Sequence, residues 1–157
     1  MDFELKFLKK EDFNGEYCKN VGIIFRAKDL ENYFMIEIKI DKNILWIKPH
    51  VRYEGMWDVM SDDKFLTEAE TQKFNDDWVH LKLTVNKNTA ELSIGDDKKY
   101  EWALPTHVDI NHIESGIKES NNISPEQDSK FGAKVTYLPE IDFRNSSGMI
   151  GFRAHLN

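Results

Sequence analysis

Apolar and polar residues alternate with a period of two along most of this chain, and this alternation restricts the folds open to it. In the clearest run, residues 33–40, Phe34, Ile36 and Ile38 are separated by more polar or flexible residues. Side chains of a β-strand point alternately to its two faces, so the run predicts a strand with one buried face. Asn, Asp and Gly separate the runs at roughly ten-residue intervals, which predicts an all-β, antiparallel sandwich of two sheets. Similar runs occupy residues 3–7, 43–48, 79–85, 90–94 and 100–104.

Two segments far apart in the chain, residues 22–27 and 148–154, echo each other. Each contains Gly, aliphatic residues, then Phe, Arg and Ala in the same order. Alternation predicts for both a strand with a buried face and an opposite face that carries an arginine. The buried residues would be Ile23, Phe25, Ile150 and Phe152, and the opposite face would hold Ile24, Arg26, Gly151 and Arg153.

The remaining segments suggest one simple domain. Residues 67–74 are predicted to form a short helix, and the polar residues 110–130 a long loop or insertion before a strand at 132–138. The chain has 157 residues, enough for a two-layer core, so we predict a single domain that spans residues 1–157.

Charge and hydropathy argue against some partners. The formal net charge is −7 and no dense run of Lys or Arg occurs, which disfavours nucleic acid and anionic membrane surfaces. No segment approaches the roughly 18 consecutive apolar residues of a membrane span, so membrane insertion is not expected. The single cysteine, Cys18, forms no internal disulfide and is predicted to be a small buried residue.

Three segments carry a family resemblance. Residues 22–37 contain Gly, two aliphatic residues, Phe-Arg, a polar turn and Asn-Tyr. Residues 78–94 form a Trp-led hairpin pattern, and residues 148–154 repeat Gly-Phe-Arg. In this order they resemble the concanavalin A-like lectin/glucanase superfamily, which includes laminin-G-like and many carbohydrate-binding domains. The resemblance implies a jelly-roll sandwich and a non-catalytic module that recognises a glycan or protein ligand as part of a larger extracellular protein.

One acidic motif raises the alternative of a glycoside hydrolase. Glu140-Ile141-Asp142 resembles the start of the Glu-Ile-Asp-x-x-Glu signature of glucanases in the same superfamily. Glu140 and Asp142 would be the nucleophile and its helper on one face of a strand, but Asn145 stands where the acid/base glutamate would follow. The favoured interpretation is therefore acidic residues at a strand end, with no catalytic role.

An aromatic and charged segment is the stronger candidate for ligand binding. Aromatic side chains present flat faces to the C–H patches of sugars, while charged groups bond their hydroxyls. Residues 49–58 are predicted to form a loop of this kind on the rim of the sandwich. The candidate ligand-binding residues here are Trp46, His50, Arg52, Tyr53 and Trp57.

A second candidate surface lies on the arginine-bearing face of the echoed strands. Arg26, Glu37 and Arg153 are predicted to share it, with Gly151 leaving room beside them. Two functions remain open for these residues: they could line a polar groove for a ligand, or they could form Arg–Glu pairs that brace neighbouring strands.

Metal binding and protein binding are weaker alternatives. The acidic pairs Asp62-Asp63, Asp76-Asp77 and Asp96-Asp97 leave structural calcium open, although none has the spacing of a dedicated calcium loop. The five histidines show no zinc-ligand spacing, and no other cofactor is expected. An adhesion module without a sugar site would instead expose Met56, Trp57 and Phe65 together as an apolar patch.

Overall fold

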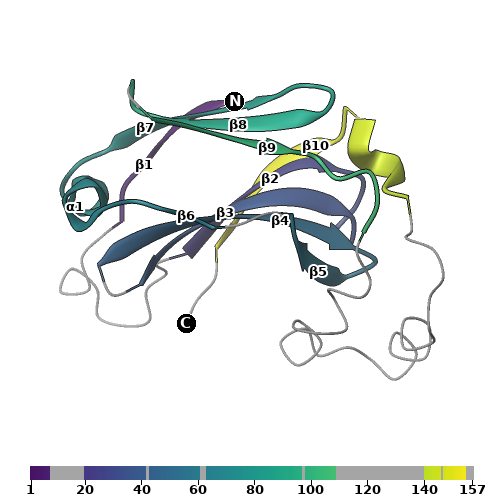
Figure 1. Ribbon diagram of the computed structural model, residues 1–157, viewed down its shortest axis with the longest axis horizontal. Coiled ribbons are helices and arrows are strands. Elements are labelled where there is room, and N and C mark those ends of the chain that lie inside the picture. The colour runs from purple at the N-terminus through teal and green to yellow at the C-terminus, as the bar shows by residue number, and fades with distance from the viewer. Residues whose placement is uncertain are drawn as a thin grey trace.

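The computed structural model describes residues 1–7, 20–41, 43–60, 63–96, 98–108, 140–145 and 147–154 (Figure 1). The loop predicted at 110–130, the strand predicted at 132–138 and Cys18 lie outside these residues. None of the described helices is long and apolar enough to cross a membrane.

Two antiparallel sheets stack face to face, as Figure 1 shows. The four-stranded sheet has the order β1-β7-β8-β9, and the six-stranded sheet has the order β10-β2-β3-β4-β5, with β6 also paired to β4. All described strand pairs are antiparallel, so the predicted all-β, antiparallel two-sheet sandwich is confirmed. The four-stranded sheet consists of β1 (Asp2–Leu5), β7 (Val79–Val85), β8 (Thr89–Ile94) and β9 (Lys98–Ala103). The six-stranded sheet consists of β2 (Asn20–Ala27), β3 (Tyr33–Asp41), β4 (Ile44–Tyr53), β5 (Met56–Val59), β6 (Lys64–Phe65) and β10 (Met149–Ala154).

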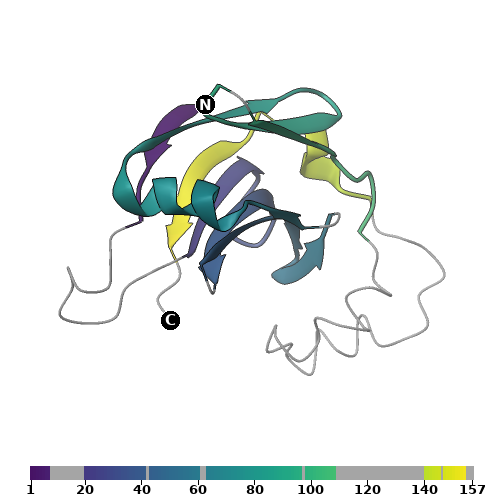
Figure 2. The same ribbon diagram turned by 60° about the vertical axis from the view of Figure 1, so that its left-hand side comes forward.

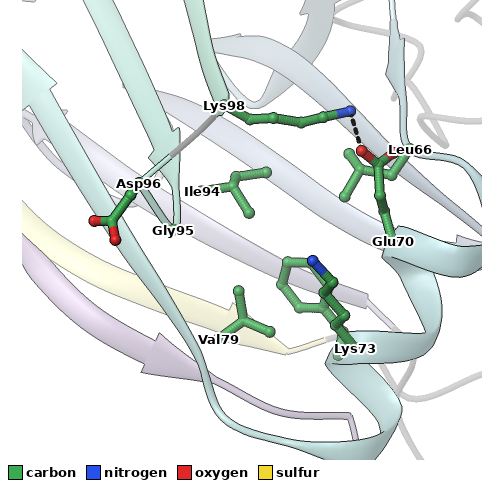
Figure 3. A pocket seen from close by; sticks show the side chains of 9 residues that line it. Leu66, Glu70, Lys73, Val79, Ile94, Gly95, Asp96 and Lys98 are labelled. Atoms are coloured by element: carbon green, nitrogen blue, oxygen red, sulfur yellow. Dashed lines mark ion pairs between the residues drawn. The ribbon is translucent and has the colours of Figure 1, made fainter.

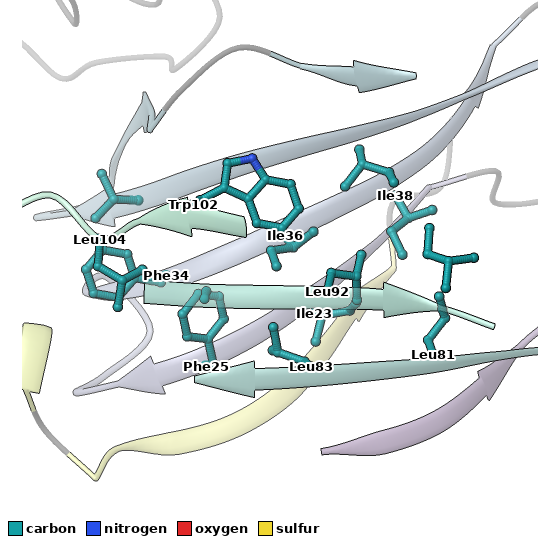
Figure 4. Close-up of a cluster of buried hydrophobic side chains, with 14 of the residues drawn as sticks. Ile23, Phe25, Phe34, Ile36, Ile38, Leu81, Leu83, Leu92, Trp102 and Leu104 are labelled. Atoms are coloured by element: carbon teal, nitrogen blue, oxygen red, sulfur yellow. The ribbon is translucent and has the colours of Figure 1, made fainter. Parts of the chain in front are cut away.

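The alternating apolar residues of both sheets meet in one hydrophobic core (Figure 4). Phe34 on β3 is fully buried, stacks on Phe25 with ring centroids 5.7 Å apart and lies 5.3 Å from Phe143. From the opposite sheet, Leu81 and Leu92 are also fully buried. Removal of these side chains from water is the main contribution to the stability of such a sandwich.

The predicted short helix is present as α1 (Glu68–Asp76), which lies at one end of the sandwich (Figure 2). Thr67 caps it: its hydroxyl accepts a hydrogen bond from the Glu70 amide, and the Glu70 carboxylate accepts one from the Thr67 amide. Phe74 is buried in the core, and the Thr71 hydroxyl accepts a hydrogen bond from the Leu45 amide at 2.9 Å. These contacts fix the helix to β4.

The segment 49–58, predicted as a loop, is instead the end of β4, a tight turn and β5. The turn residues Glu54 and Gly55 both have positive φ, as a two-residue hairpin turn requires. Pro49 lies within β4, although proline removes a backbone donor from a strand, and its carbonyl accepts a hydrogen bond from the Met60 amide. In an antiparallel ladder the backbone N and the carbonyl of one residue point toward the same neighbouring strand. The nitrogen of Pro49 therefore faces the gap between β5 and β6 along this side of β4, where a missing N–H donor costs little.

The prediction that Ile150 and Phe152 are buried is wrong. Their exposed fractions are 61% and 57%, and that of Met149 is 60%. The pairing of β10 with β2 shifts register between Met149 and Gly151, so Ile150 falls at an irregularity that strict alternation does not anticipate. Phe152 lies at the edge of the sandwich, where its ring contacts Phe3 of the other edge strand, β1, at 5.3 Å.

The same irregularity redirects Arg26 away from the face predicted for it. Arg26 has a positive φ of 50°. Its guanidinium donates hydrogen bonds to the carbonyls of Asn86 and Lys87, in the β7–β8 turn of the other sheet, and to the carbonyl of Arg144. Arg144 belongs to the short 3₁₀ helix Asp142–Asn145. Arg26 therefore braces the two sheets and is not grouped with Glu37 and Arg153, which corrects its assignment to the candidate groove.

A glycine next to this irregularity gives the first testable prediction. A Cβ added at Gly148 would lie 2.5 Å from the backbone carbon of Arg26, whereas one added at Gly151 would meet nothing within 4 Å. Gly148→Ala is expected to lower the free energy of unfolding by about 1–3 kcal/mol, and Gly151→Ala to change it by no more than about 0.5 kcal/mol. Urea unfolding of the two variants checks this; equal effects would contradict the close approach at Gly148.

Candidate functional site

The candidate site lies on the outer face of the six-stranded sheet, the face that points away from the core. Along β4, buried residues alternate with half-buried residues that point to this face. The half-buried residues are Trp46, Lys48, His50 and Arg52. Direct contacts bring together here five of the predicted ligand-binding residues, Glu37, His50, Arg52, Trp57 and Arg153.

Trp57 is the centre of this group. Its ring makes edge contacts with Tyr33 and His50, at centroid distances of 5.5 and 5.6 Å. The guanidinium carbons of Arg52 and Arg153 lie 5.1 and 5.0 Å from the centroid of the indole ring. Both distances are within cation–π range, so aromatic and cationic groups are packed against one another on a polar sheet face. We call Tyr33, His50, Arg52, Trp57 and Arg153 the Trp57 cluster.

A small apolar layer, which includes Tyr33 of the cluster, packs against Trp57. Ala27, Tyr33 and Met35 are 7%, 4% and 3% exposed although they lie outside the main core, and Ile24 and Trp57 pack against them. Gly22 is needed for this layer, because a Cβ there would collide with the sulfur of Met35. Arg153 pairs with Gly22 in the sheet. The fixed support means that the cluster is preorganised, which lowers the entropy lost when a ligand binds.

Glu37 and His50 form a hydrogen bond at one side of the cluster. The Nε2 atom of His50 lies 3.1 Å from a Glu37 carboxylate oxygen, and the Asn20 amide donates a hydrogen bond to the other oxygen. Burial alone would raise the pKa of Glu37. The hydrogen bond and charge of His50, the amide of Asn20 and the charge of Lys48 together outweigh burial and lower the pKa to about 2.

This lowered pKa predicts a pH-dependent contribution to stability. The unfolded chain takes up the proton near the ordinary pKa of 4.5, above the folded value. The stabilisation from ionised Glu37 is thus complete above about pH 4.5 and is lost as the pH falls toward about 2. In Glu37→Gln this part of the pH dependence should disappear, while Glu101→Gln, at an exposed site on β9, should keep it. Urea unfolding between these pH values checks this; an unchanged profile in Glu37→Gln would contradict it.

The two arginines of the Trp57 cluster differ in their charge partners. Arg52 donates a hydrogen bond to the carboxylate of Glu31 at 3.0 Å, and Glu31 is largely exposed. Arg153 donates one hydrogen bond, of 3.3 Å, to the hydroxyl of Tyr33, and within the described residues it has no carboxylate at ion-pair distance. The Nδ1 atom of His50 and the Nε atom of Arg52 are buried and have no hydrogen-bond partner in the same part of the structure.

Two other predicted site residues lie apart from the cluster. Trp46 is on the same face, but six residues before Arg52 on β4, a separation of about 20 Å along the strand. Its ring contacts the half-exposed Phe65 at 5.0 Å. Tyr53 packs against the main core from the other side of β4. Met56 is only 1% exposed, so Met56, Trp57 and Phe65 do not form the apolar patch expected of an adhesion module.

The acidic motif does not adopt the geometry that hydrolysis would need. Glu140 is exposed and forms an isolated bridge with His107, and Asp142 begins the 3₁₀ helix. Ile141, between them, is buried. The Asp142 carboxylate pairs with Lys28 at 2.6 Å. The two carboxylates are therefore not presented on one face of a strand, and the described residues give the hydrolase alternative no support.

The acidic pairs are the candidate calcium ligands of this chain. Among the described residues, no three His, Cys, Asp or Glu side chains are close enough to hold an ion. Asp63 pairs with Lys48 at 3.5 Å, and the amide of Gln72 donates a hydrogen bond to Asp76. Asp62 and Asp97 lie outside the described residues, so calcium binding by those pairs stays a prediction.

A pocket of about 140 Å³ opens between α1 and the β8–β9 turn (Figure 3). Its lining includes the apolar residues Phe74, Val79 and Ile94. The ion pair between Glu70 and Lys98, 2.5 Å long, also borders it. None of the ligand-binding residues predicted from sequence lines it. The pocket lies where α1 closes the end of the sandwich, and it results from the packing of the helix against the sheet.

Sequence reasoning missed several members of the site. Tyr33 and Met35 precede Glu37 on the same face of β3, and Lys48 lies opposite Glu37 on β4. The alternation of β3 already places Tyr33 and Met35 with Glu37, so the signal was present, but neither residue was named as a site candidate. The pairing of β3 with β4, which brings His50 to Glu37, could not be read from either strand alone.

Comparison with protein-family models, with curated proteins and with solved structures finds no match for this chain. A functional assignment must therefore rest on the site.

Proposed function

We propose that this chain is a non-catalytic carbohydrate-binding module of concanavalin A-like, jelly-roll type, within a larger extracellular protein, and that the outer face of the six-stranded sheet is its site. One observation carries the proposal: the Trp57 cluster combines aromatic rings with hydrogen-bonding charged groups on a supported sheet face. A fold of this kind hosts many activities, so the site and not the fold supports the function.

The chemistry of the cluster suits a sugar. An indole or phenol ring packs against the C–H face of a pyranose, and guanidinium and imidazole groups bond its hydroxyls.

The length of this face along β4 favours an oligosaccharide as the ligand. Lys48 and His50 lie between Trp46 and Arg52 along β4, and all four side chains point to the outer face. A chain of several sugars could contact Trp57 at one end and Trp46 at the other, about 20 Å away along the strand. Affinity is therefore expected to rise with chain length up to that span.

The three segments of the family resemblance form strands of the two facing sheets. Two of them form the neighbouring strands β2, β3 and β10, and the Trp-led segment forms the β7–β8 hairpin of the facing sheet. This arrangement supports a jelly-roll of the proposed type, in which segments distant in sequence are adjacent in one sheet.

Isothermal titration against a panel of neutral and acidic oligosaccharides tests the proposed function. At least one member should bind with a dissociation constant below millimolar. Absence of binding by every member at millimolar concentration would overturn carbohydrate binding.

One observation favours a second candidate, a protein-interaction module. The strand β10 is an edge that pairs only with β2 among the described strands, and Met149, Ile150 and Phe152 are more than half exposed. An apolar edge strand can accept a strand from another chain. If it does so between copies, sedimentation coefficients rise with concentration and Ile150→Lys abolishes the rise; a coefficient independent of concentration would argue against this mode.

A further inference from the structure

The outer face concentrates positive charge in an acidic protein. The whole chain carries −7, yet Lys39, Lys48, Arg52 and Arg153 all lie on this face. Lys48 pairs with Asp63 and Arg52 with Glu31, while the Glu37 carboxylate is held by His50 and Asn20. Lys39 and Arg153 are the two of these four cations for which the described residues provide no acidic partner, and of the two it is Arg153 that contacts the Trp57 cluster.

The guanidinium of Arg153 is held in place but is largely unused for hydrogen bonding. It lies 5.0 Å from the centroid of Trp57 and donates one hydrogen bond, to Tyr33. A guanidinium has five N–H donors in a planar fork that matches the two oxygens of a carboxylate. A positioned cation whose remaining donors meet no protein acceptor in the described structure is suited to bind an anion from outside.

From this geometry we infer that the ligand is an acidic glycan, and that Arg153 binds the carboxylate of a uronic acid residue whose ring packs against Trp57. This inference rests on the proposed function and adds the chemical class of the sugar. The ring and the carboxylate of a uronate are adjacent, as are the indole and the guanidinium. Lys48 and Lys39, further along the face, are placed to meet the next acidic residues of a polyuronate chain.

The test compares each acidic polysaccharide with a neutral form of itself. Polygalacturonate, alginate and hyaluronan are titrated beside their carboxyl-reduced derivatives, which keep the sugar rings and lose the charge. At least one acidic form should bind 10-fold or more tightly than its reduced form, and this preference should shrink as salt is raised.

Variants then assign the preference to Arg153. Arg153→Gln should weaken binding of the acidic form by about 10-fold or more and binding of the reduced form by a clearly smaller factor, since a hydrogen bond to a charged group contributes roughly 1.5–3 kcal/mol and one to a neutral hydroxyl contributes less. Arg153→Lys should recover only part of the loss, because it keeps the charge without the planar fork. Lys99→Gln, at an exposed residue of the four-stranded sheet, removes the same charge elsewhere and should have little effect. Melting temperatures confirm that each variant is folded.

The outcomes separate this inference from the proposed function. Equal binding of acidic and reduced forms, or binding of neutral sugars alone, would overturn the acidic ligand and leave carbohydrate binding standing. A loss in Lys99→Gln equal to that in Arg153→Gln would assign the preference to overall charge and overturn the role of Arg153. Absence of binding to every acidic and neutral glycan would overturn both.

Discussion

Replacement of Trp57 by Ala is expected to weaken glycan binding by about 30-fold or more. A central aromatic anchor typically contributes 2 kcal/mol or more to a binding site, and Trp57 is the residue that Tyr33, His50 and both arginines contact. The loss has two parts: the sugar loses its stacking surface, and Arg52 and Arg153 lose the ring that positions them. Isothermal titration with the tightest ligand of the panel measures the effect.

Two further variants keep this prediction specific. Trp57→Phe retains an aromatic face and support for Tyr33, so it should lose less affinity than Trp57→Ala and remain folded. Trp78→Ala is the matched control, because Trp78 is 60% exposed and immediately precedes β7 of the other sheet. Equal losses at Trp57 and Trp78 would show that the outer face is not the site.

Replacement of Phe34 by Ala is expected to lower the free energy of unfolding by about 3–5 kcal/mol, the usual cost of a large cavity in a core. Phe34 is fully buried between the sheets, where it contacts Phe25 and Phe143. Its neighbours come from β2 and from the 3₁₀ helix, so the cavity would loosen contacts between segments more than 100 residues apart in the chain. Urea unfolding followed by tryptophan fluorescence measures the change.

The same substitution at Phe65 provides the control. Phe65 is 53% exposed, and Trp46 is the one aromatic ring that it contacts within the described residues. Phe65→Ala should cost about 1 kcal/mol, the value of an exposed aromatic contact. Similar losses at Phe34 and Phe65 would contradict the arrangement of the core.

The fold was predictable where alternation is strict and local. The strands around Phe34 and Leu81 follow a simple inward–outward pattern, and Thr67 with Glu70 is a capping signature that can be read directly from the sequence. Prediction failed where the backbone departs from regular geometry. The irregularity at Ile150 and the positive φ of Arg26 change which way side chains point, and alternation carries no information about such positions.

The candidate site was predictable in its members more than in its arrangement. Residues such as His50, Arg52 and Trp57 stand out by chemistry, because aromatic and charged groups interleave there. Their assembly depends on long-range pairing: Arg153 reaches Trp57 across a sheet whose strands come from both ends of the chain. The hairpin was missed because the aromatic and charged composition of residues 49–58 was interpreted as a rim loop, whereas the segment pairs β4 with β5.

The most direct measurement is an NMR titration that follows the indole N–H signals of the four tryptophans, assigned by single Trp→Phe replacements. As oligosaccharide is added, the Trp57 signal should shift strongly and the Trp46 signal should shift with longer chains. The signals of Trp102, which is buried in the core, and of Trp78 should stay in place. Shifts confined to Trp78, or no shift at Trp57 at saturating ligand, would contradict a glycan site on the outer face of the six-stranded sheet.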